Sequence, residues 1–156
     1  RFGKWAKISL GQFKSPFSLE QNTSCSGLYT VNRSEVVSQL AGPQRDLGVL
    51  ITGGHDTLKI KYSLGIMNGT GLNTVDDNTG KDIIGRMVYK PLDFLSVGGS
   101  FKAGKINPTD LSEKLNDVYR YAGEISLKKD KFMLQAEYIT GQDKLYSTTK
   151  VPIYGG

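Results

Sequence analysis

The sequence predicts an all-β protein, an antiparallel up-and-down β-barrel that crosses a membrane. Three observations predict this fold: period-two alternation of apolar and polar residues, connections that are alternately short and long, and strand lengths that suit a bilayer. The hydrophobic content of 38% and the mean hydropathy of −0.32 are those of a polar chain. They fit a barrel because only every second residue of its strands meets lipid. No apolar run approaches the ~18 to 20 residues that a membrane helix needs.

Seven segments alternate with a period of two. They are Lys4–Phe13, Asp46–Gly53, Leu58–Ile66, Asp82–Lys90, Leu95–Gly104, Tyr119–Lys128 and Lys131–Thr140. The alternation is clearest in Leu58–Ile66, where leucine, isoleucine and tyrosine take one parity and lysine, serine and glycine the other. Leu50, Ile84 and Val88 break it, because they share the parity of the polar residues. The segments predict a sheet with different surroundings on its two faces.

The connections between these segments alternate in length. Short turns are predicted at Gly54–Asp56, Pro91–Asp93 and Lys129–Asp130, and long polar loops at Lys14–Arg45, Asn68–Lys81, Lys105–Asn116 and Gly141–Pro152. Outer-membrane barrels have short turns on one side and long loops on the other. Tilted strands of roughly nine to ten residues cross a hydrocarbon core of ~30 Å.

The polar parity of the predicted strands carries an excess of cations over the acids Glu124 and Glu137. The candidate pore-lining and anion-binding residues are Lys7, Lys59, Lys61, Arg86, Lys102 and Arg120, with Lys128 on the same parity. The formal net charge is +5. Rings of lysine or arginine make a water-filled pore prefer anions, so we expect passive diffusion of small anions. The alternative is a soluble β-barrel that exposes this face and binds a small anionic ligand; parity alone does not separate the two.

The sequence offers little for catalysis or for nucleic-acid binding. His55 is the only histidine and Cys25 the only cysteine, and no GxSxG or HExxH motif occurs. We therefore expect no enzyme activity, no cofactor and no metal site. Aromatic residues and cations mostly take opposite parities, which argues against a base-stacking platform and so against nucleic acid as a partner.

The segment Lys14–Arg45 is too long for a simple connection, and such loops usually have a function. In one interpretation it folds inward and places Arg33 or Arg45 at a constriction of the pore. In the other it stays outside, with its arginines paired to acids such as Glu35 or Asp46.

Several motifs follow one another along the first two thirds of the chain: Gly11-Gln12-Phe13-Lys14, Ser15-Pro16-Phe17-Ser18-Leu19-Glu20, Pro43-Gln44-Arg45-Asp46-Leu47-Gly48-Val49 and Tyr62-Ser63-Leu64-Gly65-Ile66-Met67-Asn68-Gly69. In this order they resemble the phosphate-selective porins of the O and P type. The resemblance covers roughly residues 4–104.

The resemblance implies a homotrimeric barrel of 16 to 18 strands in the bacterial outer membrane, surrounded by lipid and lipopolysaccharide, whose inward arginines and lysines conduct phosphate. On that basis residues 1–156 form part of a single barrel domain and supply seven or eight of its strands. The chain begins at Arg1 without Met and ends in what reads as a loop before another strand, so we expect it to be a piece of a longer protein.

Overall fold

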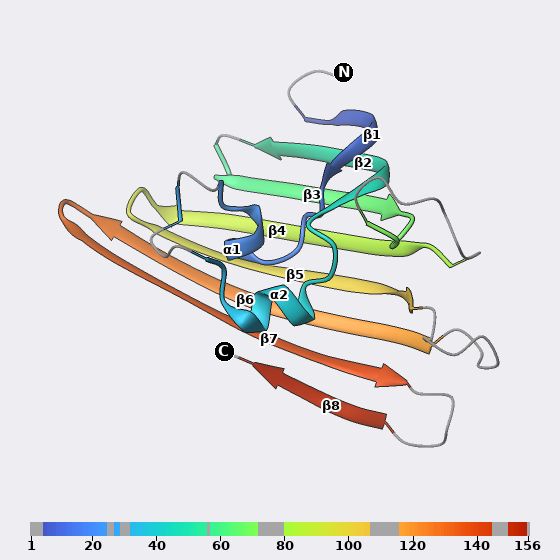
Figure 1. Cartoon of the computed structure of the whole chain (residues 1–156). Helices are drawn as coiled ribbons and strands as arrows, with labels where there is room; N and C mark the ends of the chain where they lie inside the picture. Colours follow the sequence, from blue (N-terminus) through green and yellow to red (C-terminus); the bar gives the residue numbers. More distant parts are fainter. Residues whose placement is uncertain are drawn as a thin grey trace.

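The computed structural model describes residues 5–24, 27–28, 32–55, 57–71, 80–106, 116–144 and 150–155. They form one open sheet of eight antiparallel strands, each paired with its neighbours in chain order (Figure 1). The strands are β1 (Lys7–Lys14), β2 (Arg45–His55), β3 (Ile60–Met67), β4 (Asp82–Leu92), β5 (Leu95–Ile106), β6 (Asn116–Lys129), β7 (Phe132–Lys144) and β8 (Lys150–Gly155). The all-β class and the antiparallel up-and-down order predicted from the sequence are confirmed.

The predicted strand pattern is wrong in several places: Pro91 and Leu92, predicted in a turn, belong to β4, and residues 141–144, predicted in a loop, belong to β7. β8 was not among the predicted strands, and Pro152 lies inside it, opposite Gln142, rather than in a loop. Among the described residues β8 pairs only with β7, and a strand with one neighbour tolerates a residue that cannot donate a ladder hydrogen bond. β3 begins at Ile60 rather than Leu58. Lys59 has a φ of 51°, outside the strand region, and belongs to the turn that precedes β3.

The short and long connections lie at opposite ends of the sheet (Figure 1). Segments 56–59, 93–94 and 130–131 join strands at one end, which we call the short-turn end. Segments 15–44, 68–81, 107–115 and 145–149 join them at the other.

The segment 15–44, here called the covering loop, carries two short helices, α1 (Leu19–Asn22) and α2 (Glu35–Leu40). Ser18 and Ser34 cap the helix starts by accepting hydrogen bonds from the backbone N–H groups of Gln21 and Val37. Gly42, with a φ of 75°, follows the end of α2. Within the described part of the chain, no helix is long and apolar enough to span a membrane.

One face of the sheet, here called the apolar face, is lined by exposed hydrophobic side chains. Leu10 is 77% exposed on β1, and Phe132 is 81% exposed on β7. Others with the same parity and more than a third exposed are Ile8, Leu47, Val49, Tyr62, Leu64, Ile66, Ile83, Met87, Tyr89, Phe101, Tyr119, Tyr121, Ile125, Leu134 and Tyr138.

The opposite face, here called the polar face, carries the charged and hydroxyl side chains and is crossed by the covering loop (Figure 1). Its polar residues include Lys7, Ser9, Asp46, Thr52, Lys61, Ser63, Asp82, Arg86, Ser100, Lys102, Arg120, Glu124, Ser126, Lys128, Gln135 and Glu137. The polar face is the more buried of the two, so the usual arrangement of a water-soluble sheet is inverted.

The buried hydrophobic core lies between the covering loop and the polar face. Phe17, Val37, Leu40 and Ala41 come from the loop, and Met67, Ile84, Ala122 and Ile139 come from four strands of the sheet. Leu50 packs against this cluster. The breaks in alternation at Leu50 and Ile84 therefore mark where the loop rests on the sheet.

Candidate functional site

The candidate site is the set of charged side chains on the polar face, and most of them have partners within the protein. Arg86 forms a two-bond ion pair with Glu124: Nη2 lies 2.6 Å from Oε1, and Nε lies 3.0 Å from Oε2. The paired planes of guanidinium and carboxylate make this one of the stronger ion-pair geometries. Gly98 lies directly opposite Glu124, and a Cβ there would stand 2.8 Å from Glu124 Oε1.

Lys102 and Asp82 form a buried ion pair beneath the covering loop. Lys102 Nζ lies 2.8 Å from Asp82 Oδ2, with the two side chains 9% and 4% exposed. Gly42 of the loop lies above Lys102, because a Cβ at Gly42 would be 2.7 Å from Nζ. Gly104 lies beside the acid, and a Cβ there would overlap Asp82 Oδ1. The ammonium group is thus held between its carboxylate and the end of α2.

Arg120 is buried on the polar face opposite Gly141 of β7. Its Nη1 donates to the backbone oxygen of Tyr119 at 3.3 Å. A Cβ at Gly141 would collide with Arg120 Cδ, so the arginine side chain lies along the neighbouring strand.

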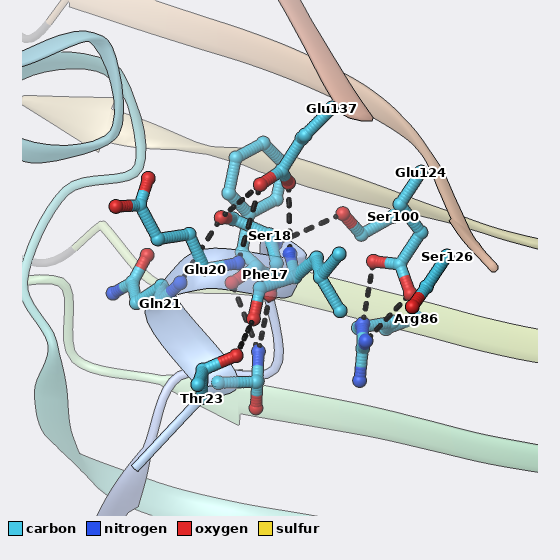
Figure 2. A network of polar contacts seen from close by, with 12 residues as sticks. Phe17, Ser18, Glu20, Gln21, Thr23, Arg86, Ser100, Glu124, Ser126 and Glu137 are labelled. Carbon is cyan, nitrogen blue, oxygen red and sulfur yellow. Dashed lines mark hydrogen bonds and ion pairs between the residues drawn. The ribbon is translucent and has the colours of Figure 1, made fainter. Parts of the chain in front are cut away.

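Glu137 of β7 binds the start of α1 (Figure 2). Its Oε1 accepts from Leu19 N at 2.8 Å, and its Oε2 accepts from Ser18 Oγ at 3.0 Å and from Glu20 N at 3.2 Å. We call these three bonds the Glu137 contact. Ser100 of β5 accepts the backbone N–H of Ser18 at 3.1 Å. The carboxylate thereby satisfies N–H groups that a helix start leaves without intrahelical partners.

Three lysines of the polar face remain exposed at the short-turn end: Lys7, Lys61 and Lys128. Among the described residues, none of these amines has an ion pair or a hydrogen bond. The four acids of this face with described side chains are all engaged: Asp46 accepts from Leu47 N and Gly69 N, and Asp82, Glu124 and Glu137 have the partners given above. The exposed positive charge of this face therefore gathers at the short-turn end.

The other sequence-predicted site residues lie away from this set. Lys59 pairs with Asp93 across the short-turn end, with 2.9 Å between Nζ and Oδ1. This partner holds the pKa of the Asp93 carboxyl below its usual value. Arg33 lies in the covering loop, where Nη2 donates to Thr23 O at 3.2 Å, and Arg45 is exposed at the start of β2 with the parity of the apolar face. Neither arginine pairs with Glu35 or Asp46 in the part of the chain that the structure describes.

The sequence reasoning identified the cations but missed their partners. Nothing in the alternation indicated that Asp82 and Glu124 would neutralise Lys102 and Arg86, since that depends on strand register. The sequence also contained no sign of the bond between Ser18 and Ser100. An apolar residue at a polar position, such as Ile84, does indicate that another segment packs on this face.

Within the described residues, no group of three or more His, Cys, Asp or Glu side chains is arranged to hold a metal ion. Comparison with known protein families, with curated proteins and with solved structures found no match to this chain.

Proposed function

We propose that this chain forms part of an outer-membrane β-barrel that lets small anions diffuse passively across the bacterial outer membrane. The main observation in support of this proposal is that the sheet exposes its apolar face and covers its polar face, the reverse of a water-soluble sheet. Apolar side chains stand exposed on every strand from β1 to β7, while charged side chains lie on the face that the loop covers. An exposed apolar surface of this extent is typical of a protein that meets lipid or another apolar partner.

A soluble β-barrel that binds an anion fits this arrangement poorly. Such a barrel fills its interior with apolar side chains and turns the polar ones to solvent. Here Leu10, Leu134 and Phe132 are among the most exposed side chains of the described strands, while Lys102 and Arg120 are buried.

The covering loop supports a barrel of more than eight strands. The interior of an eight-stranded barrel is filled by its own side chains or holds one small ligand. The polar face carries two helices and a hydrophobic cluster in addition to its own side chains. A ring with room for this loop and for water needs further strands, in line with the 16 to 18 that the resemblance to phosphate-selective porins implies.

The anion preference would come from Lys7, Lys61 and Lys128 rather than from all the cations of the polar face. Arg86 and Lys102 are neutralised by carboxylates, so they add little net charge to a solute path. The three exposed lysines lower the electrostatic barrier for anions at one mouth of the pore. Phosphate is the solute that the family resemblance suggests.

The test is recording from single channels of the full protein in planar bilayers under a KCl gradient. The proposal predicts a reversal potential whose sign shows that chloride permeates better than potassium. Changing Lys7, Lys61 and Lys128 to Glu should shift the selectivity of the channel toward cations. The matched control changes Lys59, Lys129 and Lys131, which lie outside the polar face, to Glu and should keep the anion preference. Absence of channels, or equal selectivity in the wild type and the polar-face variant, would refute the proposal.

A further inference from the structure

The covering loop contacts β7 through apolar packing on Ile139 and through polar bonds to Glu137. Leu19, Val36, Val37 and Ile139 border a cavity of about 250 Å³ between the two helices and β7. Apolar side chains therefore do not fill this part of the junction. The Glu137 contact lies at the edge of the same cavity, since Glu137, Leu19 and Glu20 also line it.

Ser18 adds a second observation at this junction. It is fully buried and has a φ of 68° with a ψ of 143°, a backbone conformation that residues with a side chain rarely adopt. Such a conformation persists only where the surroundings enforce it. Here Ser100 holds the N–H of Ser18, and Glu137 holds its hydroxyl and the next two N–H groups (Figure 2).

The Glu137 contact is possible because the carboxylate of the neighbouring Glu124 is neutralised. Glu124 lies directly opposite Glu137 on β6, and like charges at such positions repel. The two bonds from Arg86 compensate Glu124. Arg86 thus supports the loop indirectly, through the two carboxylates.

We propose that Glu137 is the positioning residue of the covering loop: by binding the start of α1 it fixes how far the loop stands from β7, and so sets the width of the water path beside it. The part about width rests on the proposed function; the part about position does not. Without the carboxylate, Ser18 is free to return to an ordinary φ, and the N-terminal half of the loop moves away from β7, so that the cavity between them widens.

The experiment measures loop position and conductance in the same variants of the full protein. Spin labels on cysteines at Ser24, two residues after α1, and at Thr57 in the short β2–β3 turn, in a Cys25→Ser background, report the position of the N-terminal half of the loop by pulsed electron resonance. Both sites are exposed. Glu137→Ala should broaden and lengthen the distance distribution and raise the single-channel conductance with added fluctuations. Glu137→Gln should have an intermediate effect, because its amide keeps one acceptor oxygen but turns a donor toward the N–H groups.

Gln135→Ala is the matched control, since Gln135 has the same parity on β7 and lines the same cavity, but its side chain donates to Ser126 rather than to the loop. It should leave both readouts as in the wild type. An unchanged distance distribution in Glu137→Ala would overturn the inference whatever the conductance. A broadened distribution with unchanged conductance would support the positioning role and count against a solute path along this face. If Glu137→Ala does not assemble, Glu137→Asp, which withdraws the carboxylate by one methylene, decides in the same way.

Discussion

At the scale of single residues, the charged side chains of the polar face act mainly on one another. A buried ion pair is a weak source of net stability, because desolvation offsets the attraction between the charges. Removal of one partner is costly, since it leaves the other charge buried and uncompensated. Among the described side chains, Lys102 and Asp82 form the most deeply buried ion pair, because both are almost fully buried beneath the loop.

Lys102→Met should therefore destabilise the protein by about 3–5 kcal/mol, the usual penalty for leaving a buried charge unpaired. The double variant Lys102→Met with Asp82→Asn should recover much of this loss. The measurement is urea unfolding of the folded protein in lipid vesicles. As a control, Lys61→Met should change stability by no more than about 0.5 kcal/mol, because Lys61 is exposed. A similar loss in both single variants would contradict the structural role given to Lys102.

At the scale of elements, the sequence was most informative where a strand has different surroundings on its two faces. The alternation located β2 to β7 to within a few residues and assigned Lys61, Arg86 and Lys102 to one face. It did not find β8, whose proline resembles a loop signal. It placed Lys59 on a strand because the lysine continues the alternation, although its backbone turns there.

The alternation of apolar and polar residues does not predict how the strands pair or where the covering loop lies. The bond from Ser18 to Glu137 joins residues that are far apart in the chain, and its geometry follows from the register of β5, β6 and β7. In the sequence Leu50 and Ile84 only break the alternation, yet these two positions indicate that a second layer lies on this face.

The two faces of a single strand make a matched pair for testing what surrounds the apolar face. Leu10 lies mid-strand on β1 and is highly exposed, whereas its neighbour Ser9 belongs to the polar face. In lipid, Leu10→Arg should cost about 2–4 kcal/mol if the site lies near the bilayer midplane. Ser9→Arg should be much better tolerated.

The measurement is the free energy of folding into lipid vesicles, together with the amount of each variant assembled in the outer membrane. If the apolar face meets water, Leu10→Arg is a surface change worth no more than about 0.5 kcal/mol. Equal behaviour of the two variants would thus count against lipid on this face.

At the scale of the whole molecule, the covering loop makes the sheet into a two-layered wall. Loop and sheet share the cluster around Phe17, Met67 and Ile84, so the loop is part of the fold rather than an appendage to it. In a barrel, this second layer lies on the inside and occupies part of the cross-section through which solutes pass.

Replacement of residues 16–43 by a short Gly–Ser connection should widen the path and raise the single-channel conductance. Ile84→Thr and Ile139→Thr are included, because removal of the loop would otherwise expose these apolar side chains to water. The same two substitutions in the presence of the loop serve as a control and should destabilise the protein without the same gain in conductance. A conductance equal to that of the wild type would place the solute path elsewhere.

The glycines beside the charged residues have a consequence for the shape of this wall. Gly98, Gly104 and Gly141 leave bare backbone where Glu124, Asp82 and Arg120 extend across the adjacent strand. The charged side chains therefore lie along the sheet surface. The residue that faces each one on the adjacent strand determines how far the charged group stands from that surface. Gly141→Ala would push the guanidinium of Arg120 away from β7, so in the proposed barrel the addition of one methyl group would narrow the pore and move its charge at the same time.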